Sequence, residues 1–507
     1  MQAPLQFLIF ILLLLAVTTQ NGQTHPVDKK HTATHVPKRH SAVPAHKTHA
    51  TTPANKRHAT VSVHKLHSDV PVNRRHPAAH AHKTHAAVAA HKRLSTAHAD
   101  RRHAAVPLHK KHAITAALKR HSYRTMQPSR IMPDSLRRAL INSENNKITN
   151  PGQLARLKEK LQQAVLSKNK VVRIVHIGDS HIQADMMTRV LRLGLQYRYG
   201  NAGRGIVFPL QEANTNGASD IFSSSNKAWR YGRLSLENSP VRCGVCGYGL
   251  QSDASNWALE IGSIPERGNE DAFDMVRLFT GKNSGCINIS YNGTEEYTVC
   301  MEPGNSFDTA EVTLRMKTNS ISLSGKSPDS TSFAFYGVSF EKRKASGVLY
   351  HSIGVNGAEF ASYNSNPLFF EQIGALKADC YIISLGTNEA QKQRLNDNDF
   401  GLQVRSMLMN LRRISPDAVF IITTPAPSFL HGVAINPKIN TVTEVLTKVS
   451  DEEKISLWNF YDIIGGNKGL AMLQTYGLYR PDFIHFNRTG YELQGFMLLS
   501  ALLKSTL

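Results

Sequence analysis

One serine of the chain stands where a strand gives way to a helix. The run VVRIVHIG (171–178) is short, apolar and β-branched, and the helical pattern DMMTRVLRLGLQYRYG begins a few residues later. Ser180 lies between them, and a hydroxyl at such a turn is exposed and close to backbone N–H groups that favour negative charge. Gly178 permits the tight turn. Ser180 is therefore a candidate nucleophile.

A serine nucleophile needs a histidine to take its proton and a carboxylate to orient that histidine. The segment RPDFIHFNRTGY places Asp482 and His485 three residues apart, just before the last helical pattern. On a turn this spacing directs both side chains to the same side, so we expect His485 to act as base and Asp482 as its acid partner. The chain order is Ser, Asp, His and the G-x-S-x-G elbow is absent, which excludes the ordinary α/β-hydrolase pattern.

Other polar residues near these positions receive supporting or structural interpretations. Asp179 is read as a turn or supporting residue rather than the catalytic acid, and His181 as a source of a supporting hydrogen bond. His176 and His351 lie on or beside apolar strands and are interpreted as core or edge histidines.

The elements around the candidate site alternate between strands and helices. Residues 131–235 and 346–507 carry this pattern, which predicts a parallel sheet covered by helices. Residues 236–345 instead hold short alternating segments such as WALEIG, DMVRLFTG, AEVTLRMK and SISLSGK, which is typical of an antiparallel β-sandwich. We therefore expect an α/β domain with a sandwich inserted into it.

Four separated blocks of the chain together resemble the SGNH (GDSL-type) hydrolases. They are GDSH at 178–181, SIGVNGA at 352–358, LGTNEA at 385–390, and Asp482 with His485. The resemblance implies a three-layer α/β/α fold of flavodoxin type and no metal or organic cofactor. It also implies that the oxyanion is held by the N–H groups of Ser180 and Gly357 and by the side-chain amide of Asn388.

The GDSH form with an inserted sandwich resembles the peptidoglycan O-acetylesterases of Gram-negative bacteria. This implies a serine esterase, a carboxylic ester hydrolase that removes O-acetyl groups from a cell-envelope glycan, with peptidoglycan as the expected substrate. An O-acyltransferase or an acetylxylan-type carbohydrate esterase would use the same serine chemistry. An envelope-anchored glycan-binding protein with an inactive hydrolase domain is the alternative of another class.

The insert resembles a carbohydrate-binding module in its position and β pattern. Trp257, Tyr291 and Tyr297 would stack on sugar rings if they were exposed, but aromatic residues in a sandwich are usually core residues.

Residues 23–130 form a degenerate basic repeat of His, Lys, Arg, Ala, Thr, Val and Pro. Most of the net charge of +22 comes from this tail, so the charge indicates neither a basic active site nor a nucleic-acid partner. The tail lacks large apolar residues and is expected to be disordered. It is either a solvated spacer, a polycation that adheres to anionic envelope polymer or a membrane surface, or a metal-binding tract.

Residues 1–22 contain the apolar run LQFLIFILLLLAV, which has the length of a signal peptide. No Lys or Arg precedes the run and no clean cleavage site follows, so an uncleaved N-terminal anchor is the alternative. Either interpretation predicts export, with the protein in the periplasm or cell envelope. The sequence does not specify an oligomeric state.

Five cysteines allow at most two disulfides in an exported protein. Cys286 with Cys300 is a plausible pair, and Cys380, within the apolar run DCYIISL, is expected to be a free buried thiol. Cys243 and Cys246 form a C-x-x-C pair that suggests redox chemistry or zinc, but no second C-x-x-C completes a zinc site.

Overall fold

A computed structural model describes residues 131–506 with six short gaps, at 254–255, 266–270, 282–285, 294, 301–306 and 327–332. The expectations for residues 1–22 and 23–130 lie outside the described residues. Within the described part, no helix is long and apolar enough to cross a membrane.

Five parallel strands form the sheet of the α/β domain. Their order is β13 (Gly347–Gly354), β1 (Val171–Gly178), β14 (Cys380–Ser384), β15 (Val419–Thr423) and β18 (Ser456–Trp458). In chain order this is 2-1-3-4-5, the doubly wound order of flavodoxin-like folds. The register sets Gly178 level with Gly354 on one side and with Ser384 on the other. The segments that follow these three strands therefore leave the sheet at the same edge.

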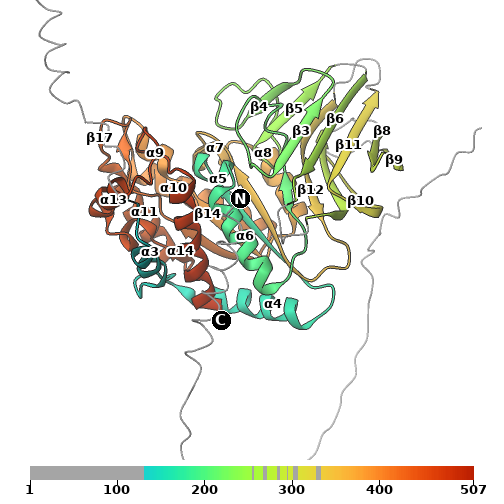
Figure 1. The fold of residues 1–507 in the computed structure, drawn as a ribbon. Coiled ribbons are helices and arrows are strands. Elements are labelled where there is room, and N and C mark those ends of the chain that lie inside the picture. The colour runs from blue at the N-terminus through green and yellow to red at the C-terminus, as the bar shows by residue number, and fades with distance from the viewer. Residues whose placement is uncertain are drawn as a thin grey trace, which may run out of the picture. The chain divides into compact units, whose positions relative to one another are not determined.

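Helices cover both faces of this sheet, because alternate strand residues point to opposite faces and both sets are apolar. Ile174 and Ile382 belong to one core with the helices α3 (Asp134–Asn142), α4 (Leu154–Leu166), α6 (Met186–Tyr199) and α14 (Arg488–Thr506). Val175 and Ile383 belong to a second core with α8 (Pro367–Ile373), α10 (Asp397–Ile414) and α11 (Lys438–Glu452). The arrangement is the expected three-layer α/β/α fold (Figure 1).

Most of the antiparallel strands form two further sheets, which pack as a sandwich (Figure 1). One sheet has the order β10 (Phe307–Thr318), β7 (Phe273–Gly281), β12 (Phe333–Glu341), β5 (Tyr248–Ser252) and β4 (Arg230–Arg233), with β2 (Gly205–Val207) also paired to β12. The other has the order β3 (Ile221–Ser225), β6 (Asn256–Ser263), β11 (Ser320–Lys326), β8 (Cys286–Tyr291) and β9 (Glu295–Cys300). Strands β2, β3 and β4 precede residue 236, so these sheets take in part of the chain ahead of the segment 236–345.

The aromatic residues of the sandwich lie mainly in its core. Trp257 stacks on Phe333 with ring centroids 3.9 Å apart, and Tyr291 is buried against Tyr297, which is partly buried. Trp257 and Tyr291 are therefore core residues of the sandwich.

The remaining elements are short. Those at the edge where the strands end are α5 (Ser180–Gln183), α7 (Phe360–Asn364) and α9 (Thr387–Gln391). The others are η2 (Pro151–Gln153), η3 (Gly374–Leu376), β16 (Phe429–Leu430), β17 (Ala434–Ile435), α12 (Phe460–Ile463) and α13 (Gly466–Thr475).

One disulfide, between Cys286 and Cys300, joins the neighbouring strands β8 and β9 and confirms the expected pair. Cys380 is a free, buried thiol as expected, and Cys243 and Cys246 are also free and buried. Burial raises the pKa of Cys246 above its ordinary range and that of Cys243 to about 11, so both stay protonated at neutral pH.

Candidate active site

Ser180 is the first residue of α5 and follows β1 by two positions. Asp179 caps this short helix, and its Oδ1 accepts the N–H of His181 at 2.9 Å. Gly178 does not have a positive φ, so the turn needs its small size and not a left-handed backbone. A Cβ there would lie 2.3 Å from Cγ1 of Ile182 and 2.8 Å from the backbone oxygen of Ser384. Glycine is needed because the helix and β14 approach so closely.

The structure brings the three predicted catalytic side chains into one chain of hydrogen bonds. Oγ of Ser180 lies 2.9 Å from Nε2 of His485, and Nδ1 of His485 lies 2.8 Å from Oδ2 of Asp482. With the proton on Nδ1, Nε2 is free to accept from the serine hydroxyl. These are the contacts that a serine nucleophile, its base and an orienting acid require.

A closed loop before α14 presents both Asp482 and His485. The N–H of Arg480 donates to the backbone oxygen of His485 at 2.8 Å, and Phe483 takes a positive φ of 52°. Oδ1 of Asp482 accepts the N–H groups of Ile484 and His485, each at 2.9 Å. Partial burial acts to raise the pKa of Asp482, but these N–H groups and the imidazole lower it below its usual value. Asp482 is therefore ionised at neutral pH.

The other two residues implied as oxyanion donors lie close together, Gly357 on the loop after β13 and Asn388 in helix α9. Gly357 is exposed and has a positive φ of 76°, a conformation that favours glycine. Nδ2 of Asn388, in the first turn of α9, donates to the backbone oxygen of Ala358 at 2.9 Å. The same nitrogen lies 3.4 Å from Oδ2 of Asp179, beside the nucleophile. One amide hydrogen of Asn388 thus has a firm partner, while the long second contact leaves the other able to turn to an oxyanion.

Two buried carboxyl groups support this edge of the sheet. Burial raises the pKa of Asp179 to about 7, against the opposing hydrogen bonds from the N–H of His181 and from Thr387. Burial likewise raises the pKa of Glu389 to about 8, although its Oε1 accepts the N–H of Phe360 at 2.9 Å. Neither group touches the hydroxyl of Ser180, which agrees with a supporting role for Asp179.

His181 contacts the proposed base without replacing it. Its ring stacks on that of His485 with centroids 5.0 Å apart, and its Nδ1 lies 3.0 Å from the hydroxyl of Tyr491. Burial and the nearby His485 lower the pKa of His181 to about 3, so this ring is neutral at physiological pH. The expected supporting hydrogen bond is therefore the one with Tyr491.

The remaining two strand histidines are fully buried. His176 lies 2.7 Å from both Tyr350 Oη and Ser384 Oγ, and His351 accepts the backbone N–H of Ile206 at 3.1 Å. They are core histidines, as their positions on apolar strands indicated.

Sequence reasoning missed Gln183, the last residue of α5. Its Oε1 accepts the N–H of Asn356 at 2.7 Å and the hydroxyl of Tyr248 at 2.6 Å. Its Nε2 donates to Oγ1 of Thr215 at 3.1 Å and to the backbone oxygen of Asn216 at 2.6 Å. Gln183 thus holds the loop that carries Gly357. A polar residue one turn after the nucleophile, on the same side of the helix, was the available signal.

In the part of the chain that the structure describes, no group of three or more His, Cys, Asp or Glu side chains is arranged to hold a metal ion.

Comparison with known proteins addresses the family. Residues 327–493 match the model of the GDSL-like lipase/acylhydrolase family. The matched segment includes Gly357, Asn388, Asp482 and His485, whereas Ser180 precedes it because the sandwich separates the first block from the others. A comparison with curated proteins gives no match.

Among solved structures, a peptidoglycan O-acetylesterase is similar at 20% identity and a TM-score of 0.61, over 71% of this chain and 99% of that chain. A Bacillus subtilis protein shares 13% identity at a TM-score of 0.30, over 56% of this chain and 90% of its own. An acetylxylan esterase from Geobacillus stearothermophilus shares 14% identity at a TM-score of 0.26, over 31% of this chain and 73% of that chain. The first match covers 71% of this chain, more than the α/β domain alone, so the sandwich is part of the shared fold. Residues 327–493 thus match the GDSL-like lipase/acylhydrolase family, and the solved structure shows that the fold is shared.

Proposed function

We propose that the protein is a serine esterase that removes O-acetyl groups from a cell-envelope glycan, with peptidoglycan as the substrate. The observation that carries the chemistry is the unbroken chain from Ser180 through His485 to Asp482, with contacts of 2.9 and 2.8 Å. The similarity to a peptidoglycan O-acetylesterase over almost the whole of that chain supports the choice of substrate.

The reaction is acyl transfer in two steps. His485 takes the proton of Ser180 while Oγ attacks the acetyl carbonyl carbon. The tetrahedral intermediate then expels the sugar oxygen, which receives that proton from His485, and an acetyl-enzyme remains. Water attacks this ester with His485 again as base, so that acetate leaves and the Ser180 hydroxyl is restored.

Three donors would hold the oxyanion in both steps. They are the N–H of Ser180, the N–H of Gly357 and the side-chain amide of Asn388. Oxyanion stabilisation lowers the barrier because negative charge develops on the carbonyl oxygen as the tetrahedral intermediate forms. Asp482 keeps the proton of His485 on Nδ1 and stabilises the imidazolium that forms.

Acetate release from two acetylated polymers tests the proposal. The purified chain is incubated with O-acetylated peptidoglycan and, separately, with acetylated xylan. We expect faster release from peptidoglycan, and no release above background by Ser180→Ala, whose fold should be intact by circular dichroism. Equal or faster release from xylan would argue against the peptidoglycan assignment, and an active Ser180→Ala variant would overturn the nucleophile assignment.

We also propose that the protein works outside the cytoplasm, in the periplasm or cell envelope, with the insert contributing to glycan binding. The apolar run at residues 5–17 and the basic segment 23–130 support this location. Fractionation of cells that express the full chain tests it, since recovery of the protein in the cytoplasmic fraction would contradict export.

A further inference from the structure

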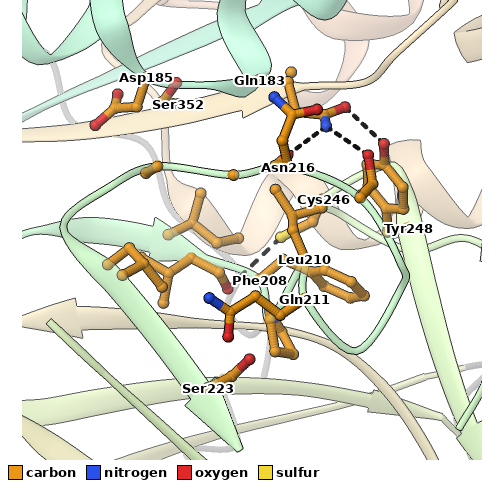
Figure 2. A pocket seen from close by; sticks show the side chains of 18 of the residues that line it. Gln183, Asp185, Phe208, Leu210, Gln211, Asn216, Ser223, Cys246, Tyr248 and Ser352 are labelled. Atoms are coloured by element: carbon orange, nitrogen blue, oxygen red, sulfur yellow. Dashed lines mark hydrogen bonds between the residues drawn. The ribbon is translucent and has the colours of Figure 1, made fainter.

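A cavity of about 360 Å³ lies beside the active-site edge of the parallel sheet (Figure 2). One wall is formed by Gln183 and Asp185, which follow β1, and by residues 352–354 at the end of β13. The facing wall belongs to residues 206–211, 215–219 and 221–223 and to Tyr248 of the sandwich. The lining does not include Ser180, Asp482 or His485, so the cavity is adjacent to the catalytic side chains and separate from them.

The lining combines apolar surface with unused hydrogen-bonding groups. Phe208, Leu210 and Phe222 supply apolar surface. Among the described residues, none makes a hydrogen bond to the side chain of Gln211 or Ser219, and both residues are exposed at the cavity. Such a combination suits a ligand with C–H faces and several hydroxyl or amide groups.

The two charged side chains of the cavity wall are paired with each other. Within the described lining they are Asp185 and Arg204, and both belong to a buried cluster with Arg192 and Asp220. The cluster holds two guanidinium groups and two carboxylates at separations of 2.7 to 3.0 Å. No charge in this wall is left to pair with an ionic ligand, so the chemistry favours a neutral one.

The cavity is close to both parts of the catalytic machinery. Gln183 ends the helix that Ser180 begins, and three helical residues rise by only about 4.5 Å. The same side chain contacts Tyr248 of the cavity wall (Figure 2). It also bonds Thr215 of that wall and the N–H of Asn356, next to Gly357. A ligand in the cavity would therefore lie one helical turn from the nucleophile and against the loop of an oxyanion donor.

We propose that this cavity is a sugar subsite, which binds a neutral sugar ring of the same glycan strand that carries the acetyl ester. This inference rests on the proposed glycan esterase function. The apolar side chains would pack against the C–H face of the ring, while Gln211 and Ser219 would bond its hydroxyl or acetamido groups. Binding there would place the neighbouring acetylated unit at Ser180.

Two adjacent serines of β3 provide a matched pair of variants. Ser223 lines the cavity, whereas Ser224 is exposed and outside it. We expect Ser223→Trp to fill the cavity and to lower kcat/KM for acetate release from O-acetylated peptidoglycan by about tenfold or more. Hydrolysis of p-nitrophenyl acetate, which does not reach the cavity, should remain within about twofold of the unmodified chain. Ser224→Trp should leave both activities unchanged.

A second pair of variants, with smaller changes of side chain, serves if the tryptophan variant does not fold. Gln211→Ala removes an exposed amide from the cavity, and Gln163→Ala removes an exposed amide from α4. In the Ser180→Ala background, calorimetry with the β-1,4-linked trimer of N-acetylglucosamine should show weaker binding for Gln211→Ala alone. The full-length chain is used throughout.

The outcomes separate the two proposals. Equal peptidoglycan activity of Ser223→Trp and the unmodified chain, or equal trimer binding by the two glutamine variants, would overturn the subsite and leave the esterase function intact. An unmodified chain that cleaves p-nitrophenyl acetate but releases no acetate from peptidoglycan would overturn the peptidoglycan function and the subsite with it.

Discussion

Replacing Asp482 by asparagine tests whether the loop before α14 controls the tautomer of His485. Oδ1 of Asp482 accepts two backbone N–H groups at 2.9 Å, and Oδ2 faces Nδ1 of His485 at 2.8 Å. An amide has only one oxygen, and the two backbone donors would keep that oxygen at the Oδ1 position. The NH2 group of the asparagine would then face Nδ1. Turning the amide over would instead leave both backbone donors facing an NH2 group.

The loss of activity in Asp482→Asn follows from which imidazole nitrogen of His485 carries the proton. An NH2 donor at Nδ1 requires Nδ1 to accept, so the neutral ring carries its proton on Nε2, 2.9 Å from Oγ of Ser180. That nitrogen cannot take the serine proton. A wrong tautomer of this kind costs about 10⁴ in kcat in serine enzymes. At about 1.36 kcal/mol for each factor of ten, the barrier rises by about 5.4 kcal/mol.

Initial rates with p-nitrophenyl acetate measure this loss, and Asp482→Ala is the matched control. Alanine also removes the carboxylate but leaves Nδ1 open to water, so the ring can still adopt the productive tautomer. We therefore expect the alanine variant to be at least as active as the asparagine variant, with both folded by circular dichroism. An asparagine variant within tenfold of the unmodified enzyme would refute the reasoning.

The other predictions concern the oxyanion loops and the buried carboxyl group. Asn388→Ala should lower kcat by about a hundredfold or more because one oxyanion donor is lost, and an unchanged kcat would assign Asn388 a purely structural role. Gly357→Ala should lower the unfolding free energy by about 1–2 kcal/mol, because alanine is strained at this positive φ. The added Cβ would meet only Ser235, at an ordinary contact distance of 3.6 Å, so packing should add little to this cost. Urea titration measures the change. Burial raises the pKa of Asp179 to about 7. Between pH 4 and 7 the folded chain therefore keeps a proton on Asp179 that the unfolded chain has lost, so the unfolding free energy falls as pH rises. Asp179→Asn should remove this fall. The unfolding free energy of the variant minus that of the unmodified chain should therefore increase from pH 4 to 7, and a difference that does not change with pH would contradict the raised pKa.

The convergence of the site at one sheet edge could be predicted from sequence. The blocks that contain Ser180, Gly357 and Asn388 each follow a short apolar run, and parallel strands end at a common edge. The structure adds the register, in which Gly178 lies level with Gly354 and Ser384. The prediction worked because a strand shows in its local pattern, and a helix between successive strands makes them run parallel.

Features that depend on contacts between distant residues could not be predicted. Strand β18 has only the three residues Ser456–Trp458, too few to show a period, and its partner β15 identifies it as a strand. One of the two contacts that require a glycine at 178 is with the backbone of Ser384, about two hundred residues further along the chain. Gln183 contacts Tyr248 and Asn356, and no local pattern connects these positions.

The way the sandwich joins the hydrolase domain has a consequence for function. The chain leaves the α/β domain through β2 and returns through β12, and these two strands pair with each other, so both crossings lie together. Beyond that crossing, buried hydrogen bonds join the two parts, because Gln372 accepts the N–H of Val245 at 2.8 Å and Gln183 accepts the hydroxyl of Tyr248 at 2.6 Å. A module that was only tethered would be joined by the covalent crossing alone. Here, separating the two parts would leave buried polar groups without partners, at a free-energy cost of about 1–3 kcal/mol for each group. One of these hydrogen bonds ends on Gln183, the glutamine that holds the Gly357 loop, so a shift of the insert would be passed directly to that loop.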